Sequence, residues 1–308
     1  MSVAPTKSIS ASTRLGAVFG RPIRHSASPA MQNAGIASLG LDWMYAACDV
    51  SPDVLKVALE GARAMRWIGV NLTVPHKLLA VPFMDLLDDS AQRWGAVNTV
   101  VFEAEDDEGL WRPLGQIRDL GGPLRMRGYN TDADAIVRAI REDLAIEPRG
   151  ARVLLLGAGG AGRTAALRLA DEGVGELWLV NRTPSKAEAL ARELEERFPA
   201  VHIGLGYPAS DVEIVLNATS LGLKPGDPLP VDASQFSLGK AFTAYDMVYR
   251  PSQTPFLQAA QAAGCRVANG LGMLLYQGAA ALELWSGRPA PVEAMKTALI
   301  QEVYGQRA

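Results

Sequence analysis

The chain has 308 residues, of which 48% are apolar and 20% are charged, and its formal net charge is -3. Because domains commonly hold about 150 residues, this length predicts about two of them. A slightly acidic chain lacks the strong basic excess typical of nucleic-acid-binding proteins, so we do not expect it to belong to that class. No apolar run reaches the ~18 residues that a membrane-spanning helix needs. We therefore expect a cytoplasmic protein that acts on a small molecule, without a nucleic-acid or membrane partner.

The first 14 residues are rich in serine and threonine and contain neither an acidic residue nor an apolar stretch. This composition does not predict a secretory signal, and we favour a disordered tail over the alternative of a transit peptide. Cys48 and Cys265 stand far apart, without a C-x-x-C pair. We therefore expect no disulfide framework and no metal site, and interpret both cysteines as small buried residues in a reducing cytosol.

Short apolar or β-branched runs alternate with longer segments of helical period, a pattern typical of an α/β fold with mainly parallel sheets. The predicted strands cover residues 15–19, 67–72, 97–102, 153–156, 177–180 and 214–216, and the clearest helical segments cover 53–65 and 187–198. Four hydroxyl-proline pairs predict helix starts, with the hydroxyl at the N-cap and proline at the first helical position. These pairs are Ser28-Pro29, Ser51-Pro52, Thr183-Pro184 and Thr254-Pro255.

The segment 103–127 differs in composition from the rest of the chain. It begins with Glu-Ala-Glu-Asp-Asp-Glu, continues through Gly121-Gly-Pro, and carries Arg112, Arg118, Arg125 and Arg127. We favour a solvated hairpin extension over an arm that binds a partner.

Residues 152–164 read Arg-Val-Leu-Leu-Leu-Gly-Ala-Gly-Gly-Ala-Gly-Arg-Thr. Gly157, Gly159 and Gly162 thus form a G-x-G-x-x-G pattern between an apolar strand and an alanine-rich helix. Glycines in this context let the backbone approach a pyrophosphate, whose charge lies at the helix N-terminus. The alternative is a glycine-rich turn needed only for packing. We favour a dinucleotide site.

The end of the next strand discriminates between the two nicotinamide cofactors. An NAD site usually offers a carboxylate there to the ribose 2′-hydroxyl. This chain instead reads Asn181-Arg182-Thr183-Pro184-Ser185-Lys186, with two cations and no carboxylate. Arg182 and Lys186 are alternatively plain exposed helix residues, although cations at a helix N-terminus are slightly unfavourable. The sequence therefore favours NADP over NAD.

Polar residues occur where other apolar strands end. Ser26 and Ser28 stand on a turn that leads into a helix, where hydroxyls and helix amides suit a small carboxylate. Ligands of open α/β sheets bind at the carboxyl ends of the strands. Hydroxyl, amide and carboxylate side chains at the ends of the other strands therefore fit a polyhydroxylated substrate. Each of them is alternatively a turn or cap residue, as is Ser28. They are Asn71, Thr73, Asn98, Thr99, Asn130, Thr131 and Asp132.

Lys77 and Asp132 are the candidates for acid/base chemistry. Residues 69–77 read as a strand that breaks at Pro75 and then presents Lys77. Reduction of a carbonyl by hydride needs a proton at the forming alkoxide, which a lysine can supply. A nearby carboxylate favours the charged lysine, whereas burial lowers its pKa. The alternative for Lys77 is a surface cation after a proline break.

These residues, together with further motifs, resemble the shikimate dehydrogenase family from about Leu15 to about Trp285. The motifs of the first half are Gly20-x-Pro-x-x-His-Ser-x-Ser-Pro29, Gly69-x-Asn-x-Thr-x-Pro-His-Lys77, Gly95-Ala-Val-Asn-Thr99 and Gly128-x-Asn-Thr-Asp132. The second half carries the glycine loop, Asn181-Arg-Thr183, Asn217-Ala-Thr-Ser220, Asp246-Met-Val-Tyr249, Thr254-Pro255, Asn269-Gly-Leu-Gly-Met273 and Gln277.

The resemblance implies an α/β fold with an N-terminal substrate domain, whose sheet is parallel-rich, and a Rossmann-like NADP domain. Residues 1–130 and 270–308 would form the substrate-binding catalytic domain, to which the C-terminal helices return, and 131–269 the NADP-binding domain. The implied activity is the reversible, NADP-dependent reduction of 3-dehydroshikimate to shikimate, an oxidoreductase step of aromatic amino-acid biosynthesis, in a monomer or homodimer.

The resemblance also assigns roles to residues. Lys77 and Asp132 are the catalytic pair, and Ser26 and Ser28 hold the substrate carboxylate close to Tyr249. The ring hydroxyls contact Asn71, Thr73, Asn98, Asp132 and Gln277. The cofactor contacts Gly157, Ala158, Gly159, Gly160, Ala161, Gly162, Asn181, Arg182, Thr183, Lys186, Thr219, Ser220, Met247 and Gly270.

Some positions depart from the family pattern. Ala133 and Ala135 stand where glycine is frequent, Lys186 where arginine is common, and Gln32 where histidine is frequent. Lysine lacks the planar fork of arginine, so the phosphate clamp is expected to be looser. A quinate/shikimate or aminoshikimate dehydrogenase is the nearest alternative function, and a non-catalytic ligand sensor on the same fold is the alternative of another class.

Overall fold

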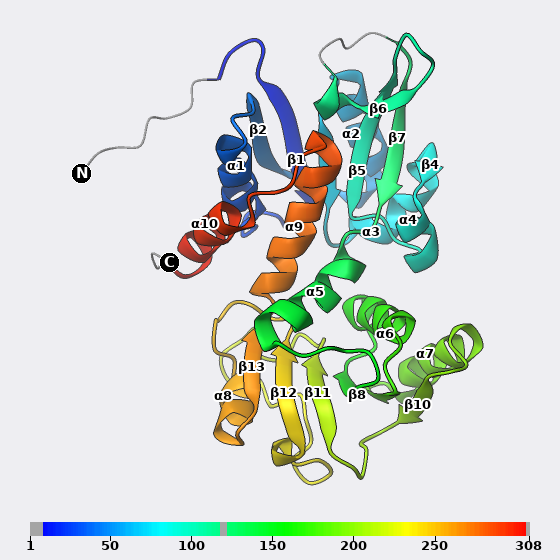
Figure 1. Ribbon diagram of the computed structural model, residues 1–308, viewed down its shortest axis with the longest axis vertical. Coiled ribbons are helices and arrows are strands. Elements are labelled where there is room, and N and C mark those ends of the chain that lie inside the picture. Colours follow the sequence, from blue (N-terminus) through cyan, green and yellow to red (C-terminus); the bar gives the residue numbers. More distant parts are fainter. Residues whose placement is uncertain (1–8, 118–121, 306–308) are drawn as a thin grey trace. The chain divides into compact units, whose positions relative to one another are not determined.

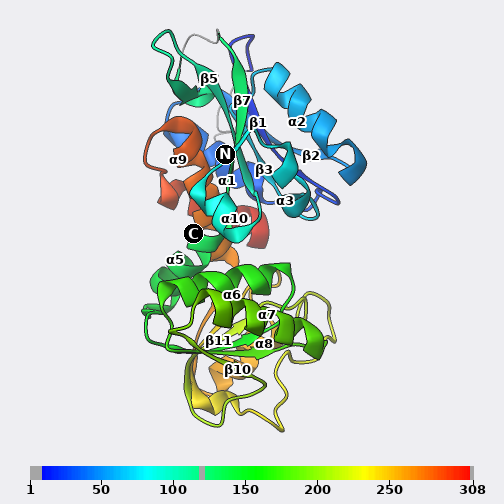
Figure 2. The same ribbon diagram turned by 90° about the vertical axis from the view of Figure 1, so that its right-hand side faces the viewer.

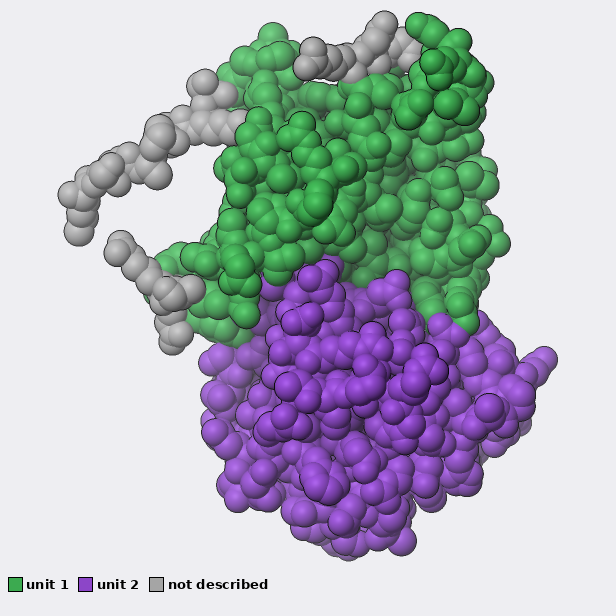
Figure 3. Space-filling view, in the orientation of Figure 1, with its two compact units in different colours: residues 1–131, 277–308 green, residues 132–276 purple. Residues whose placement is uncertain are grey.

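The computed structural model describes residues 9–117 and 122–305. It confirms the predicted α/β fold class and the return of the C-terminal helices to the N-terminal part of the chain. The chain divides into two compact units (Figure 3). Unit 1 comprises Met1–Thr131 and Gln277–Ala308, and unit 2 comprises Asp132–Tyr276.

Unit 1 is built on a mixed sheet whose strands follow the order β2-β1-β3-β5-β7-β4, with β6 beside β5. The pairs β1–β2, β1–β3 and β4–β7 are parallel, whereas β5 is antiparallel to its three neighbours. The strands are β1 (Arg14–Gly20), β2 (Trp43–Asp49), β3 (Gly69–Leu72), β4 (Leu86–Leu87), β5 (Thr99–Glu105), β6 (Trp111–Pro113) and β7 (Leu124–Tyr129).

Helices cover the sheet of unit 1 and carry its C-terminal part. They are α1 (Ser28–Ser38), α2 (Leu55–Ala64), α3 (His76–Leu79), α4 (Asp89–Trp94), α10 (Val292–Tyr304) and the part of α9 (Leu271–Ser286) that begins at Gln277. Short 3-10 turns lie at Pro52–Val54, Val81–Phe83 and Leu114–Gln116. Helices α1 and α10 contact each other although they come from opposite ends of the chain (Figure 1).

Trp285 anchors helix α9 to the sheet of unit 1. Its side chain is fully buried, and its indole Nε1 donates to the backbone oxygen of Val100 at 3.1 Å. The indole lies over Gly69, where a Cβ would come within 2.0 Å of Nε1. A glycine at the start of β3 is therefore what allows this close approach between helix and sheet.

Unit 2 is a six-stranded sheet of order β10-β9-β8-β11-β12-β13 in which all neighbours are parallel. Helices α6 and α7 lie next to each other (Figure 2), and α8 packs on β12 and β13. The strands are β8 (Arg152–Leu156), β9 (Glu176–Val180), β10 (His202–Leu205), β11 (Val212–Asn217), β12 (Ala241–Asp246) and β13 (Arg266–Asn269). The helices are α5 (Asp132–Leu144), α6 (Gly160–Glu172), α7 (Pro184–Arg197) and α8 (Pro255–Ala262), with a 3-10 turn at Leu238–Lys240.

The hydroxyl-proline pairs mark helix starts, but only one hydroxyl forms the predicted cap. Thr254 Oγ1 accepts from the backbone N–H of Leu257 at 3.3 Å. Ser51 and Thr183 occupy N-cap positions without a side-chain cap hydrogen bond. Ser28 is the first helical residue, not the N-cap, so that prediction is wrong by one position. Proline is thus common to all four helix starts, whereas three of the four hydroxyls form no capping hydrogen bond.

The segment 103–127 forms a hairpin, as expected. Its acidic start is only partly solvated, because Asp107 and Glu108 are exposed and Glu103 is not. Strand β5 pairs with β6 through Glu105 and Trp111. Glu103 is buried and pairs with Arg125, whose Nε lies 2.5 Å from its carboxylate. The guanidinium of Arg125 also stacks 4.2 Å from the ring centroid of Trp111. Arg118 and residues 1–8 of the predicted 14-residue tail lie outside the described residues. Residues 11 and 12 form a turn and Arg14 begins β1, so the tail prediction is wrong for this last part.

The two cysteines are free, as expected, but only Cys265 is buried, and Cys48 is half-buried. Within residues 9–117 and 122–305, no three His, Cys, Asp or Glu side chains gather in a way that would hold a metal ion. None of the helices in those ranges is long and apolar enough to cross a membrane.

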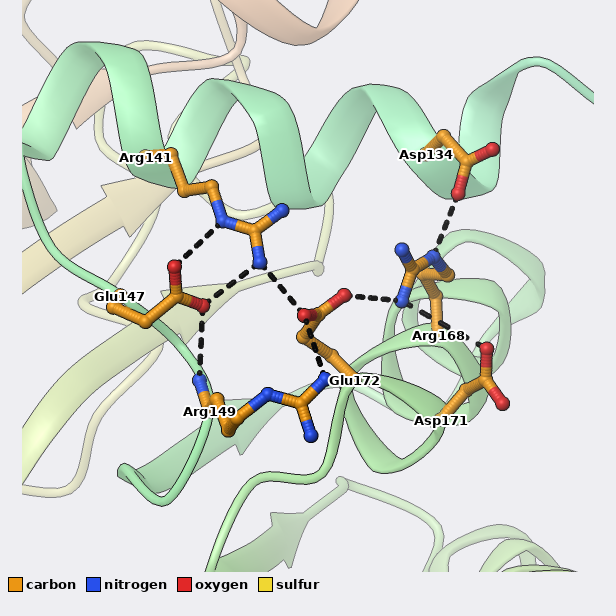
Figure 4. A network of polar contacts seen from close by, with 7 residues as sticks. All are labelled: Asp134, Arg141, Glu147, Arg149, Arg168, Asp171 and Glu172. Carbon is orange, nitrogen blue, oxygen red and sulfur yellow. Dashed lines mark hydrogen bonds and ion pairs between the residues drawn. The ribbon is translucent and has the colours of Figure 1, made fainter.

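An ion-pair network joins α5 to α6 and to the loop that precedes β8 (Figure 4). Glu172, whose side chain is 9% exposed, contacts Arg168 at 2.8 Å and Arg141 at 2.7 Å. Burial alone would raise the pKa of Glu172, but the hydrogen bonds from the two arginines outweigh burial and lower it. Arg141 also bonds Glu147, and Arg168 bonds Asp134. The carboxylate of Glu172 thus pairs with two cations at once, of which Arg168 is largely buried and Arg141 is 40% exposed.

Gly69→Ala is expected to destabilise the protein by about 2 kcal/mol, because the new methyl group overpacks against Trp285. The matched control is Gly61→Ala in α2, where a Cβ meets no atom within 4 Å. There alanine is expected to stabilise by about 0.5–1 kcal/mol, since glycine costs more backbone entropy in a helix. Urea denaturation measures both, and equal stability of the two variants would contradict the packing described for Trp285.

Glu172→Gln is expected to lower the free energy of unfolding by about 2 kcal/mol at pH 7, because two charge-assisted hydrogen bonds lose their anion. The folded-state pKa lies below the usual 4.5. The stabilisation is therefore present above pH 4.5 and is lost as the pH falls through the lower, folded-state value. Denaturation of both proteins between pH 3 and pH 7 measures the difference. A difference that stays constant over this range would refute the role of the charge.

Candidate functional site

A cluster of buried polar side chains lies at the carboxyl end of β3 in unit 1. Asn71 pairs in register with Thr99, the first residue of β5. Its Nδ2 donates to Thr99 Oγ1 at 3.0 Å and to the Asn98 backbone oxygen at 3.3 Å, while its Oδ1 accepts from Tyr45 Oη at 2.7 Å. Both ends of the Asn71 amide are thereby fixed by neighbouring chain segments.

Asn98 connects this cluster to the segment that follows β7. Its Oδ1 accepts from the Thr131 backbone N–H at 2.7 Å, and its Nδ2 donates to Thr131 Oγ1 at 2.9 Å. An amide nitrogen carries two N–H groups, so one donor of Asn98 remains for a ligand. Asn98 is 1% exposed. Its side chain both holds the backbone at Thr131 and offers a donor at the strand end.

The turn after β1 places Ser26 and Ser28 close together. Ser26 Oγ accepts from the Ser28 backbone N–H at 3.3 Å, and the Ser26 N–H bonds the Ile23 oxygen. Ser28 is 9% exposed and Ser26 is half-buried. Thr73, half-buried as well, donates its backbone N–H to Phe19 at the end of β1. These hydroxyls therefore lie at the same edge of the sheet as Asn71.

Lys77 lies in the four-residue helix α3 rather than on a strand end. The helix follows β3 after one turn, and the His76 N–H bonds the oxygen of Thr73. The backbone oxygen of Lys77 accepts from Val97 at 2.8 Å, which fixes α3 to the segment that leads into β5. Lys77 is half-buried. The amino group is therefore carried by a segment whose backbone is bonded on both sides.

Asp132 and Tyr249 belong to unit 2, whereas the other substrate candidates belong to unit 1. Asp132 is the first residue of α5 and is 8% exposed. It directly follows Thr131, whose Oγ1 donates to the backbone oxygen of Gln277 at 3.1 Å. Tyr249 is half-buried, and burial raises its pKa despite the opposing charge of Arg250. Asp132 is therefore joined by one peptide bond to Thr131, the residue that Asn98 holds by two hydrogen bonds.

The glycine loop of unit 2 has the backbone geometry that the motif predicts. Gly157 has a φ of +109°, and a Cβ there would lie 3.0 Å from the backbone of Ala218. A Cβ at Gly162 would lie 2.0 Å from the Gly157 oxygen. At Gly159 and Gly160, a Cβ would meet no atom within 4 Å. The outer two glycines are needed for packing, and the inner two leave open space before the N-terminus of α6.

Asn181 holds the glycine loop against the end of β9. Its Oδ1 accepts from the backbone N–H of Ala158 at 3.0 Å, and its Nδ2 donates to the Thr183 oxygen at 2.8 Å. Arg182, Thr183 and Lys186 are exposed. The structure thus gives Asn181 a positioning role in the loop, and leaves the two cations as the groups nearest in sequence that can meet a phosphate.

A second asparagine, Asn217, orders the turn after β11. Its Oδ1 accepts from the N–H and Oγ1 of Thr219, at 3.0 and 2.7 Å, and its Nδ2 donates to Asp246 Oδ1 at 2.9 Å. Burial raises the pKa of Asp246, although hydrogen bonds from Thr254, Val248 and Asn217 oppose the rise. Of the other cofactor candidates, Ser220 is exposed, Met247 is half-buried and Gly270 is buried. Asn217 and Asp246 both stand in motifs of the sequence. The hydrogen bond between their side chains was not predicted, because a contact between residues far apart in the chain leaves no local signal.

Three positions that depart from the family pattern lie inside the units. Ala133 and Ala135 are buried on α5. Gln32 is fully buried, and its Nε2 donates to the Gly278 oxygen at 2.8 Å. Gln32 therefore ties α1 to α9 within unit 1.

Family models match three parts of the chain. They are a "shikimate dehydrogenase substrate binding domain" at residues 18–100, a "shikimate / quinate 5-dehydrogenase" model at 140–221 and a "shikimate 5'-dehydrogenase C-terminal domain" at 270–300. A shikimate dehydrogenase (NADP+) of Moorella thermoacetica is 44% identical over 94% of each chain.

Solved structures resemble the whole chain. A shikimate dehydrogenase in complex with NADP+ is 33% identical, covers 96% of this chain and 98% of its own, and has a TM-score of 0.82. A ligand-free 5-ketofructose reductase of Gluconobacter sp. strain CHM43 is also 33% identical, with coverages of 93% and 98% and a TM-score of 0.76. With relatives this similar over nearly its full length, the chain belongs to the shikimate dehydrogenase family.

Proposed function

We propose that this protein catalyses the reversible, NADP-dependent interconversion of 3-dehydroshikimate and shikimate. One observation carries the proposal: a member of this family combines the open glycine loop at Gly159 and Gly160 with the buried amide cluster of Asn71 and Asn98. The loop suits a pyrophosphate, and the cluster suits a hydroxylated ring. Curated relatives bear the name shikimate dehydrogenase (NADP+). The reaction is a step of aromatic amino-acid biosynthesis.

NADP is favoured over NAD by the exposed cations after β9. Arg182 and Lys186 follow the strand that usually carries a carboxylate in NAD sites. A guanidinium forms charge-assisted hydrogen bonds with a phosphate, and the lysine adds a point charge. The pyrophosphate would lie against the backbone of residues 157–162, and Thr219, Ser220, Met247 and Gly270 complete the proposed cofactor contacts.

The substrate contacts follow from the polar strand ends of unit 1. Ser26 and Ser28 would hold the carboxylate, with Tyr249 near it. The remaining N–H of Asn98 would donate to a ring hydroxyl. The other proposed partners of the hydroxyl groups are Asn71, Thr73, Asp132 and Gln277.

Lys77 and Asp132 are the proposed catalytic pair. Bound NADPH supplies the hydride that reduces the carbonyl carbon. Lys77 Nζ gives its proton to the oxygen that becomes the alcohol, and it takes the proton back in the oxidation direction. Asp132 orients the ammonium group and favours its charged form. As further parts of the proposal, the protein works in the cytoplasm as a monomer or homodimer.

Initial rates of shikimate and of quinate oxidation, each with NADP and with NAD, test this function. The reduced nicotinamide is followed by its absorbance. The proposal requires a strong preference for shikimate with NADP. A preference for quinate or NAD would assign the protein to a quinate/shikimate dehydrogenase activity, and absence of turnover with every pair would favour a ligand sensor.

Lys77→Ala is expected to lower kcat by at least about a hundredfold, because the proton donor is lost. Its folding and its affinity for NADPH should not change, since Lys77 lies outside the glycine loop. The control is Lys56→Ala, which removes an exposed lysine of unit 1. Steady-state rates, with nucleotide binding followed by fluorescence, give both quantities. Near-wild-type turnover of Lys77→Ala would remove this residue from the mechanism.

Arg182→Gln is expected to raise the KM for NADP about tenfold, because a charge-assisted hydrogen bond to the 2′-phosphate is lost. The KM for NAD should hardly change. The matched control, Arg192→Gln, removes an exposed arginine from helix α7, which begins two residues after Arg182. An equal effect on both cofactors, or the same effect in the control, would contradict the assignment of Arg182 as a phosphate ligand.

A further inference from the structure

A cavity of about 860 Å³ lies in unit 1 at the amino end of β1, and the proposed function does not use it. Its lining includes Arg14, Arg66, Arg288, Asp42 and Trp67. The proposed substrate groups lie at the other end of the strand. Since β1 has seven residues and a strand rises about 3.3 Å per residue, the two ends are about 20 Å apart. The cavity is therefore separate from the substrate groups of this unit.

The guanidinium group of Arg14 belongs to the lining of this cavity, and only one of its three nitrogens forms a hydrogen bond that the structure describes. Its Nη1 donates to the backbone oxygens of Leu114 and Ile117. Its Nε and Nη2 atoms are enclosed and have no hydrogen-bond partner among residues 9–117 and 122–305. Buried N–H groups normally have an acceptor, and an unpaired one on a charged group is especially costly. Nε and Nη2 lie on the same side of the planar guanidinium, an arrangement that matches the two oxygens of a carboxylate or phosphate once the groups that enclose these nitrogens move aside.

Arg66 adds a second guanidinium with the same property. The Ile68 N–H bonds the Leu15 oxygen, and this register sets Arg66 close to the start of β1. Within the part of the chain that the structure describes, Arg66 Nη1 is buried and has no hydrogen-bond partner. The residue also has a φ of +56°, a conformation that favours glycine or asparagine after a helix. A long cationic side chain at this position points to a use that compensates for an unfavourable backbone.

The remaining lining sets the charge and polarity of the cavity. Arg288 is the third cation, and Asp42 is the single carboxylate. Asp42 already accepts from Ser12 and Thr13, at 3.0 and 2.9 Å, so it does not neutralise the arginines by direct contact. Three cations against one anion leave a net charge of +2. Trp67 and neighbouring apolar side chains line the rest of the space.

We propose that this cavity, which we call the β1 anion pocket, binds a small organic anion whose carboxylate or phosphate group is held by Arg14 and Arg66. The apolar part of the ligand packs near Trp67, and Arg288 lies at the exposed side of the pocket. Carboxylates and phosphates share the paired oxygens that a guanidinium fork binds. The volume lies within the range of ordinary small-molecule sites.

Isothermal titration calorimetry with inorganic phosphate and, separately, with benzoate tests the pocket. The titrations are made at constant ionic strength, because exposed charges are screened by salt. The protein carries Arg182→Gln and Lys186→Gln, so that the proposed 2′-phosphate clamp does not contribute. The test variant adds Arg66→Asn, since asparagine tolerates a positive φ. The control adds Arg266→Asn instead, which removes an exposed arginine of unit 2. Arg288→Gln is a second pocket variant if Arg66→Asn fails to fold.

At least one of the two probes is expected to bind at a single site that weakens tenfold or more in Arg66→Asn and is unchanged in Arg266→Asn. Preference for phosphate or for benzoate then identifies the head group. Binding that is equal in all proteins would place the anion elsewhere. Absence of binding by both probes would mean that the arginines are solvated by water. Equal weakening in Arg266→Asn would reduce the effect to net charge. Each of these three results would overturn the proposal.

Discussion

Asparagine side chains at the ends of buried strands hold the backbone around the candidate groups of both units. An amide can donate and accept at once, and so it can extend the contact between two chain segments beyond the point where their backbone hydrogen bonds end. In unit 1, Asn98 accepts from the backbone N–H of Thr131 and donates to the hydroxyl of the same residue. In unit 2, Asn181 binds the glycine loop through Ala158. Because these amides are buried or half-buried, leaving them unpaired would be costly.

The hydrogen bonds of these amides distinguish side chains that position the backbone from side chains that are proposed to contact a ligand. Asn181 uses its oxygen and its nitrogen on the protein itself, and so its main effect is to fix the shape of the loop. The exposed Arg182 has no such duty among the hydrogen bonds that the structure describes, and it is the group proposed for the phosphate. Asn98 combines both roles, since one of its donors remains after it has bonded Thr131. The affinity of each unit for its proposed ligand therefore depends on side chains that also stabilise the fold.

The sequence predicted the type and order of the main elements because their signals are local. The apolar strand before Gly157 and the alanine-rich helix after it were both correct, since strand, glycine turn and helix each follow from neighbouring residues. The mixed sheet of unit 1 was not foreseen in detail. The antiparallel pairing of β3 and β5 joins residues about 30 positions apart, and their apolar runs do not encode direction. The capping role of Ser28 was wrong because proline alone sufficed to start the helix.

The candidate site was likewise predictable only where its sequence signals are local. Glycines with special backbone geometry and polar residues at strand ends could be identified from their spacing. The partners of those residues could not, because Tyr45 bonds Asn71 and Trp285 packs on Gly69 through contacts distant in sequence. The unpaired nitrogens of Arg14 and Arg66 are likewise invisible in sequence, where both residues read as ordinary surface cations.

Hydrogen exchange followed by mass spectrometry, with NADP alone and with shikimate alone, tests the assignment of ligands to the two units most directly. The account predicts that NADP slows exchange at backbone amides of residues 157–162 and 181–186. Shikimate should slow exchange mainly at residues 26–28, 71–77 and 98–99. Protection by shikimate confined to unit 2, or protection by NADP that spares the glycine loop, would contradict the account.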